Sequence, residues 1–140
     1  MINDNLTLTG ALTISLNDVV VQETNNLVVT AGKNWVADRM NDANTVMTHM
    51  ALGTSATAAA AGQTALVAEL DRNALTSTTV STNTVAYACT WAAGDGTGAI
   101  TEAGLFDAAS TGDMLARTVF SVVNKGASDS ITITWTITIS

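Results

Sequence analysis

The sequence contains few of the residues on which catalytic and nucleic-acid-binding sites depend. Its 140 residues include one cysteine, one histidine, no proline, and five lysines and arginines against 12 acidic residues. A single cysteine excludes an intrachain disulfide framework and a cysteine-rich zinc site, and a single histidine removes most sites that use imidazole. Because phosphate contacts need lysine and arginine, the net charge of −7 argues against a nucleic-acid partner. These absences predict a protein that is not an enzyme and that holds no cofactor or metal.

Targeting and membrane signals are also missing. Residues 1–10 lack a basic region followed by an apolar one, so we expect no signal peptide. No apolar run approaches the roughly 18 residues that a membrane helix needs. The sequence contains no GxSxG, HExxH, CxxC or GxGxxG motif. We therefore expect no membrane partner and none of the chemistry that these motifs indicate.

The abundant residues favour an all-β fold. Threonine and alanine are the commonest, 47% of the chain is apolar, and only 12% is charged. The segment ITITWTITI (131–139) alternates strictly, which is typical of a strand with one buried face. Similar short segments, separated by turns, lie at 6–16, 19–22, 27–30, 46–53, 75–81, 85–91, 99–106 and 114–123. The spacing predicts a β-sandwich of the Greek-key or jelly-roll type.

One short helix is expected near residues 31–42. Thr30 is a candidate N-cap, and Trp35, Val36 and Met40 form a narrow apolar stripe. No linker divides the chain, so residues 1–140 are interpreted as a single sandwich domain. Residues 1–16 are interpreted as the start of this domain, either as an extended arm or as an edge strand.

A glycine-rich segment and a run of small residues stand out in composition. Residues 94–98 (GDGTG) lack the lysine of a phosphate-binding loop and the several acids of a calcium loop, so a hairpin turn is the better interpretation. Residues 54–63 (TSATAAAAGQ) are compatible with a helical turn or with a surface loop, and residues 64–70 with a brief helical turn. The sequence therefore predicts no phosphate or calcium site at residues 94–98.

Single reactive side chains are interpreted as structural. His49 has no second ligand or base beside it in the sequence, and Cys89 lies on an apolar alternating face. Trp35, Trp91 and Trp135 all stand at positions expected to be buried. This leaves no aromatic platform for sugar, and it disfavours a small hydrolase or a carbohydrate-binding module.

The scarce charges in apolar surroundings are the remaining candidates. Arg72 is expected to pair with Glu69 or Glu102, although a carboxylate pair for glycoside hydrolysis and an interface role are the alternatives. Arg39 and Arg117 are expected to pair with aspartates, either within the chain or across subunits. The sequence does not choose between these partners.

Several segments, in order, resemble the small virion proteins of tailed bacteriophages. They are NLVVTAGKNWVADRM (26–40), MTHMALGT (47–54), TAL and ELDR (64–66 and 69–72), ITEAGLF (100–106), MLARTVF (114–120), KG (125–126) and ITITWTITI (131–139). The resemblance covers residues 6–140, and it extends to proteins labelled tail-fibre-like and to capsid decoration, or cement, proteins. That family has no catalytic set, so the resemblance implies no catalytic, cofactor-binding or metal-binding residues.

The resemblance implies a structural role in a virion assembled in the host cytoplasm. The first expectation is a decoration protein that binds the outer face of the head, with the major capsid protein as its partner. It would be a homo-oligomer, with a trimer favoured. The alternative is a tail, fibre or baseplate component with tail proteins as partners. The N-terminal arm and the C-terminal strand are expected to offer edges for pairing with neighbouring chains.

Overall fold

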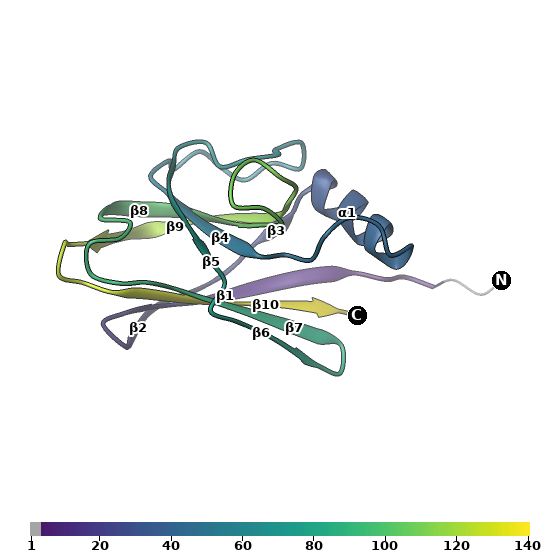
Figure 1. The fold of residues 1–140 in the computed structure, drawn as a ribbon, viewed down its shortest axis with the longest axis horizontal. Helices are drawn as coiled ribbons and strands as arrows, with labels where there is room; N and C mark the ends of the chain where they lie inside the picture. The colour runs from purple at the N-terminus through teal and green to yellow at the C-terminus, as the bar shows by residue number, and fades with distance from the viewer. Residues whose placement is uncertain (1–3) are drawn as a thin grey trace.

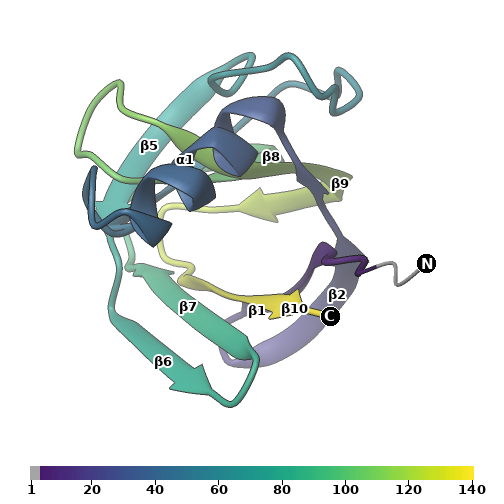
Figure 2. The same ribbon diagram turned by 90° about the vertical axis from the view of Figure 1, so that its right-hand side faces the viewer.

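The computed structural model describes residues 4–140, which form two antiparallel five-stranded sheets packed face to face (Figure 1; Figure 2). Sheet A has the order β2-β1-β10-β7-β6, with β1 (Leu8–Leu16), β2 (Val19–Asn25), β6 (Ser77–Ser81), β7 (Thr84–Trp91) and β10 (Ile131–Ile139). Sheet B has the order β3-β9-β8-β4-β5, with β3 (Leu27–Val28), β4 (His49–Gly53), β5 (Glu69–Ala74), β8 (Gly98–Phe106) and β9 (Met114–Lys125). Strands account for 53% of the structure and the helix for 8%. The predicted all-β sandwich with one short helix is confirmed.

Strand β10 is the centre of sheet A. It pairs with β1 on one side and β7 on the other, and its alternation places one row of side chains in the core between the sheets. The buried row consists of Ile131, Ile133, Trp135 and Ile137. The expectation that the C-terminal strand offers an edge is therefore wrong, because both of its edges are paired.

Strand β1 is also an interior strand. It lies between β2 and β10, so the interpretation of residues 1–16 as an arm or edge strand is wrong for residues 8–16. Residues 1–3 lie outside the described residues. Gly10 lies within β1 and pairs with Ile137 in unbroken register. A side chain at Gly10 would overlap the Asn26 amide.

The helix α1 (Thr30–Met40) lies across one end of the sandwich and contacts β9 (Figure 2). Its N-cap is Val29 rather than Thr30, so the expected hydroxyl cap is wrong. Trp35 is buried and donates its indole N–H to the carbonyl of Thr45 at 2.7 Å. Met40 is 83% exposed, so the apolar stripe ends before the last turn.

The two sheets differ in how their outer faces are covered. The three inner strands of sheet A, β1, β10 and β7, alternate buried residues with more exposed ones, whereas most of β8 and β9 is buried on both faces. The pairing of β8 with β9 shifts register between Ile100 and Glu102. That shift leaves Val123 buried and Val122 51% exposed. The outer face of sheet B is thus the place where the remaining chain packs.

Candidate interaction surface

The segment covering the outer face of sheet B is a compact loop, which we call the Ω-loop (residues 54–68). Its ends meet where the Thr54 N–H donates to the Ala68 carbonyl at 3.0 Å. Compact surface loops with adjacent ends are frequently functional. The segment carries no charged residue and forms neither helix nor strand. Of the two interpretations left open for residues 54–63 the surface loop is correct, and the helical turn expected at 64–70 is not formed.

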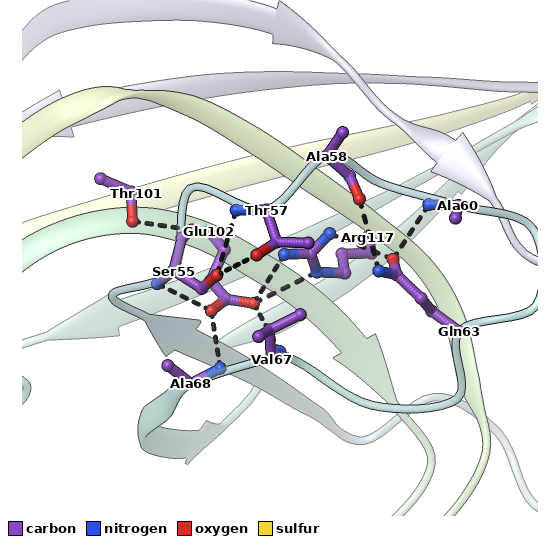
Figure 3. Close-up of polar contacts among 10 residues, drawn as sticks. All are labelled: Ser55, Thr57, Ala58, Ala60, Gln63, Val67, Ala68, Thr101, Glu102 and Arg117. Carbon is purple, nitrogen blue, oxygen red and sulfur yellow. Dashed lines mark hydrogen bonds and ion pairs between the residues drawn. The ribbon is translucent and has the colours of Figure 1, made fainter.

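A buried carboxylate ties the two ends of the Ω-loop to the sheet. Glu102, on β8, is fully buried and accepts hydrogen bonds from three loop amides (Figure 3). Its Oε2 accepts from the N–H groups of Ser55 and Ala68, and its Oε1 accepts from the N–H of Val67, each at 2.9 Å. One side chain therefore satisfies backbone groups that burial would otherwise leave unpaired.

The charge of Glu102 is balanced by Arg117 on β9. The guanidinium is fully buried, and its Nε and Nη2 both lie 3.1 Å from Oε1 of Glu102. Its Nη1 donates to Oε1 of Gln63 at 3.0 Å, and that same oxygen accepts from the N–H of Ala60 (Figure 3). The Gln63 amide nitrogen donates to the carbonyl of Ala58. The ion pair thus reaches the middle of the Ω-loop as well as its ends.

Glycines on the sheet make room for this packing. A Cβ on Gly53 would lie 2.6 Å from the carbonyl oxygen of Ala68, and one on Gly104 would lie 2.9 Å from a methyl of Leu66. Leu66 is buried in a second small core, with Val29, Ala51, Phe106 and Met114. The Ω-loop is therefore held from below by a hydrophobic anchor as well as by the ion pair.

What the Ω-loop presents to solvent is uncharged and mostly apolar. Its exposed residues include Ala56, Ala58, Ala60, Ala65 and Val67. A groove of about 390 Å³ runs beside it, lined by residues such as Leu27, Ala56, Ala58 and Val119. A surface fixed before contact loses little conformational entropy when a partner binds. The arrangement is suited to contact with another protein.

A second charged cluster fastens the 107–113 loop. Arg72 makes a two-pronged contact with Glu69, with Nη2 at 2.7 Å from Oε1 and Nε at 3.2 Å from Oε2. The guanidinium also lies 3.7 Å from the centre of the Phe106 ring, and its Nη1 donates to the carbonyls of Ala108 and Thr111. The predicted Arg72–Glu69 pair is confirmed, and Glu102 is committed to another arginine.

The other two arginines follow the predictions in part. Arg39 lies 3.8 Å from Asp42 at the surface, as expected for pairing with an aspartate. Arg117 pairs with Glu102 instead, so the aspartate expected for it is wrong. Glu102, which the sequence offered as an alternative partner for Arg72, is therefore the partner of Arg117. The Arg117–Glu102 pair was not identifiable from spacing, because its two residues come from different strands.

The single histidine and cysteine lie apart from the Ω-loop. His49 is half-buried, and its Nδ1 lies 2.7 Å from the Thr48 hydroxyl. Cys89 is fully buried, and burial raises the pKa of its thiol to about 12. A thiol with so high a pKa is almost wholly protonated at neutral pH. The interpretation of Cys89 as a small buried hydrophobe fits this environment.

All three tryptophans are buried, as predicted. Trp91 and Trp135 are fully inaccessible, and Trp35 is only 9% exposed. The indole N–H of Trp135 donates to Oδ1 of Asn26 at 2.8 Å. None of them forms an exposed platform for a sugar ring.

The glycine-rich segment 94–98 is not a hairpin turn, and that prediction is wrong. It carries the chain from β7 in sheet A to β8 in sheet B, because both edges of β7 are already paired with β10 and β6. Gly94 and Gly96 have φ of 90° and 59°, which glycine adopts without strain. Lys125, only 2% exposed, fastens this crossover by donating from Nζ to the carbonyl of Ala92 at 3.0 Å.

Burial of Arg117 and Lys125 removes cations from the surface of a chain that has only five. Sequence reasoning missed Gln63 and Lys125, although both are essential parts of these clusters. A polar residue at the end of an alanine run was the available signal for Gln63. Nothing in the sequence around Lys125 distinguishes it from a solvated lysine in a turn.

Within residues 4–140, no three His, Cys, Asp or Glu side chains gather as metal ligands would. The one helix in this part of the chain, of 11 residues, is too short to cross a membrane. Comparisons of the chain with protein-family models, with curated proteins and with solved structures found no match.

Proposed function

We propose that this chain is a structural protein of a tailed-bacteriophage virion, most specifically a capsid decoration protein on the outer face of the head. The observation that carries the proposal is the Ω-loop, an exposed and uncharged surface held in place by the buried Glu102–Arg117 pair. A subunit that binds a fixed lattice gains from such a surface, because little must be ordered on binding. The resemblance of residues 6–140 to small virion proteins supports the same role.

The mechanism proposed is repeated surface burial. Each copy contacts the major capsid protein through the Ω-loop, and copies gather as trimers at three-fold positions of the lattice. Binding to the assembled shell stabilises it by mass action, and many linked contacts hold more strongly than one. The shortage of surface cations is consistent with a protein partner, since contact with nucleic acid would need them.

The alternative proposal is a tail, fibre or baseplate component. It is supported by the same resemblance, which includes proteins labelled tail-fibre-like. The Ω-loop would then contact a tail protein. The two proposals differ most sharply in the number of copies per particle.

Copy number is therefore the test of location. Purified virions would be analysed by quantitative mass spectrometry, with the major capsid protein as the internal standard. Hundreds of copies are expected for decoration of the head, whereas a few to a few dozen would establish the tail alternative. Complete absence from the particle would overturn both.

A matched pair of substitutions tests the Ω-loop as the contact. Ala58→Arg places a long cation on its exposed surface, and Ala127→Arg makes the same change in an exposed turn elsewhere. Both proteins are expected to fold, because neither side chain is buried. Only Ala58→Arg is expected to lower the copy number. Equal occupancy of the two variants would remove the Ω-loop from the proposal.

A further inference from the structure

Strand β6 forms one edge of sheet A, and no other strand of residues 4–140 pairs with its outer side. All five of its residues, Ser77–Ser81, are exposed. The β6–β7 hairpin projects at a corner of the sandwich, at the lower left of Figure 2. The side chains of Thr78 and Val80 lie on the inner face of the sheet, opposite Tyr87 and Val85, yet they remain exposed. The hairpin therefore extends beyond the cover that sheet B provides.

The hairpin also determines which backbone groups point outward. Its two-residue loop, Thr82 and Asn83, is closed by Ser81 and Thr84. In such a hairpin the closing pair exchanges hydrogen bonds, and alternate residues of each strand then point their N–H and C=O groups away from the partner. The outward-pointing groups of β6 belong to Thr78 and Val80. An edge with these groups free is a template for another strand.

The other edges of the sandwich oppose self-pairing. Strand β2 carries Glu23 and pairs with β1 through a register shift. Strand β5 carries Glu69 and Asp71 against the single cation Arg72, so its net charge is acidic. Strand β3 has only two residues. In a chain of net charge −7, two copies of an acidic edge repel each other. Strand β6 (STTVS) contains no charge, so it is the edge on which two copies meet without repulsion.

We propose that β6 pairs antiparallel with β6 of a second copy, about a two-fold axis through Thr79. In this register Thr78 of each chain faces Val80 of the other, and each of these pairs exchanges backbone hydrogen bonds. Thr79 of one chain faces Thr79 of the other, and Ser77 of each chain faces Ser81 of the other. Thr–Val pairs and hydroxyl pairs are favourable neighbours on a sheet. The surface is complementary to itself, as a two-fold contact requires.

Apolar residues beside the edge add to the contact. Val80 is 70% exposed and lies opposite Val85. Val85 lines an apolar groove of about 290 Å³ between α1 and sheet A, together with Met40 and Ile139. A contact made by one short strand buries less than the roughly 1,200 Å² of a standard interface, so the dimer is expected to dissociate on dilution. Copies held close together on an assembly would pair more completely.

Cysteine cross-linking tests the two-fold register directly. In the proposed pairing the two Thr79 Cα atoms are about 4.5 Å apart, which is within disulfide range. Thr79→Cys is expected to form a covalent dimer under mild oxidation. Val20→Cys, on the exposed opposite edge of the same sheet, is the matched control, and the native Cys89 is fully buried. A Thr79→Cys protein that cross-links no faster than Val20→Cys would overturn the register.

Sedimentation of the uncross-linked protein tests the contact itself. Thr79→Lys places two cations opposite each other across the axis, and it is expected to raise the dimer dissociation constant about tenfold or more. Thr134→Lys makes the same change on the exposed face of the central strand β10 and should leave the constant unchanged. A wild-type protein that remains monomeric into the millimolar range would refute the proposal, as would equal constants for the two variants. The inference does not depend on the proposed function, because these measurements require no virion.

Discussion

The outer face of sheet A is exposed to solvent, whereas the outer face of sheet B is covered by another part of the chain. The outer face of sheet A is open, and β10 covers it with threonines that alternate with the buried isoleucines and Trp135. The outer face of sheet B lies beneath the Ω-loop, and there the strands present Glu102, Phe106 and Arg117. An exposed face needs only polar side chains that fit a strand. A covered face must satisfy every polar group of the segment that covers it.

This difference explains why two of the few charged residues, Glu102 and Arg117, are buried on sheet B. Burying a carboxylate costs free energy unless it is paired and hydrogen-bonded, and Glu102 has both an arginine and three amides as partners. The ion pair shapes the covering loop, while the alternation of β10 supplies the core between the sheets. The two sheets should therefore respond differently to substitution.

The largest effect is expected from Trp135→Ala in sheet A. The substitution leaves a cavity in the core between the sheets and removes the donor to the Asn26 amide. Truncation of a buried tryptophan costs about 3–5 kcal/mol of unfolding free energy. Denaturant unfolding of the purified variant measures this. A melting temperature within about a degree or two of wild type would contradict the assignment of Trp135 to the core.

Glu102→Gln tests the covered face of sheet B. It keeps the side-chain volume but leaves the Arg117 guanidinium buried without a counter-charge, at a cost of about 3–4 kcal/mol. Unlike the loss of Trp135, it should release the Ω-loop before the rest of the fold. Hydrogen exchange is therefore expected to quicken first at the amides of Ser55, Val67 and Ala68.

A double variant separates the ion pair from the loop anchor. Replacing both partners, as Glu102→Gln with Arg117→Met, removes the unpaired buried charge, so its cost should be less than the sum of the two single variants. The amides of the Ω-loop would still lose their carboxylate acceptor. If the costs of the single variants simply add, the pair is not coupled and its role in holding the loop is refuted.

The same contrast explains what the sequence could predict. Strands with one open face alternate with period two, so residues 131–139 and 85–91 were assigned correctly from pattern alone. Alternation identifies a buried face, but it does not say which strands are neighbours. The edge role given to β10 and β1 was wrong for that reason, since edges are decided by pairing between distant segments.

The covered face was much less predictable. The Glu102–Arg117 pair joins two strands, and Gln63 reaches it from a loop that has no periodic pattern. The register shift in β8–β9 changes which valine faces inward, and no local residue marks it. Such features depend on which segments meet in three dimensions. The isolated charges in apolar surroundings correctly indicated ion pairs, and Glu69 was among the partners expected for Arg72, but spacing could not name Glu102 as the partner of Arg117.

A smaller effect is expected from Arg72→Met, which loosens only the edge of sheet B. The variant loses the contact with Glu69 and the hydrogen bonds to the carbonyls of Ala108 and Thr111. We expect a loss of about 1–3 kcal/mol, because hydrogen bonds to charged groups contribute on this scale. Arg39→Met is the control: its ion pair with Asp42 and its hydrogen bond to the carbonyl of Asn44 are both exposed, and the variant should lose less than about 1 kcal/mol. Thermal unfolding that ranks Arg39→Met as the more damaging change would contradict the clamp assigned to Arg72.

The smallest effect is expected on the open face of sheet A. Thr134→Lys places a lysine at an exposed position between two half-buried threonines, in a protein with an excess of acidic residues. The free energy of unfolding should therefore change by no more than about 0.5 kcal/mol. The matched change on sheet B is Ala51→Lys, which introduces a cation into the fully buried second core beneath Leu66. That variant should lose several kcal/mol, on the order of the cost of an unpaired buried charge. Comparable stabilities for the two lysine variants in denaturant unfolding would mean that the outer faces do not differ as described, because only a covered face forces the lysine out of water.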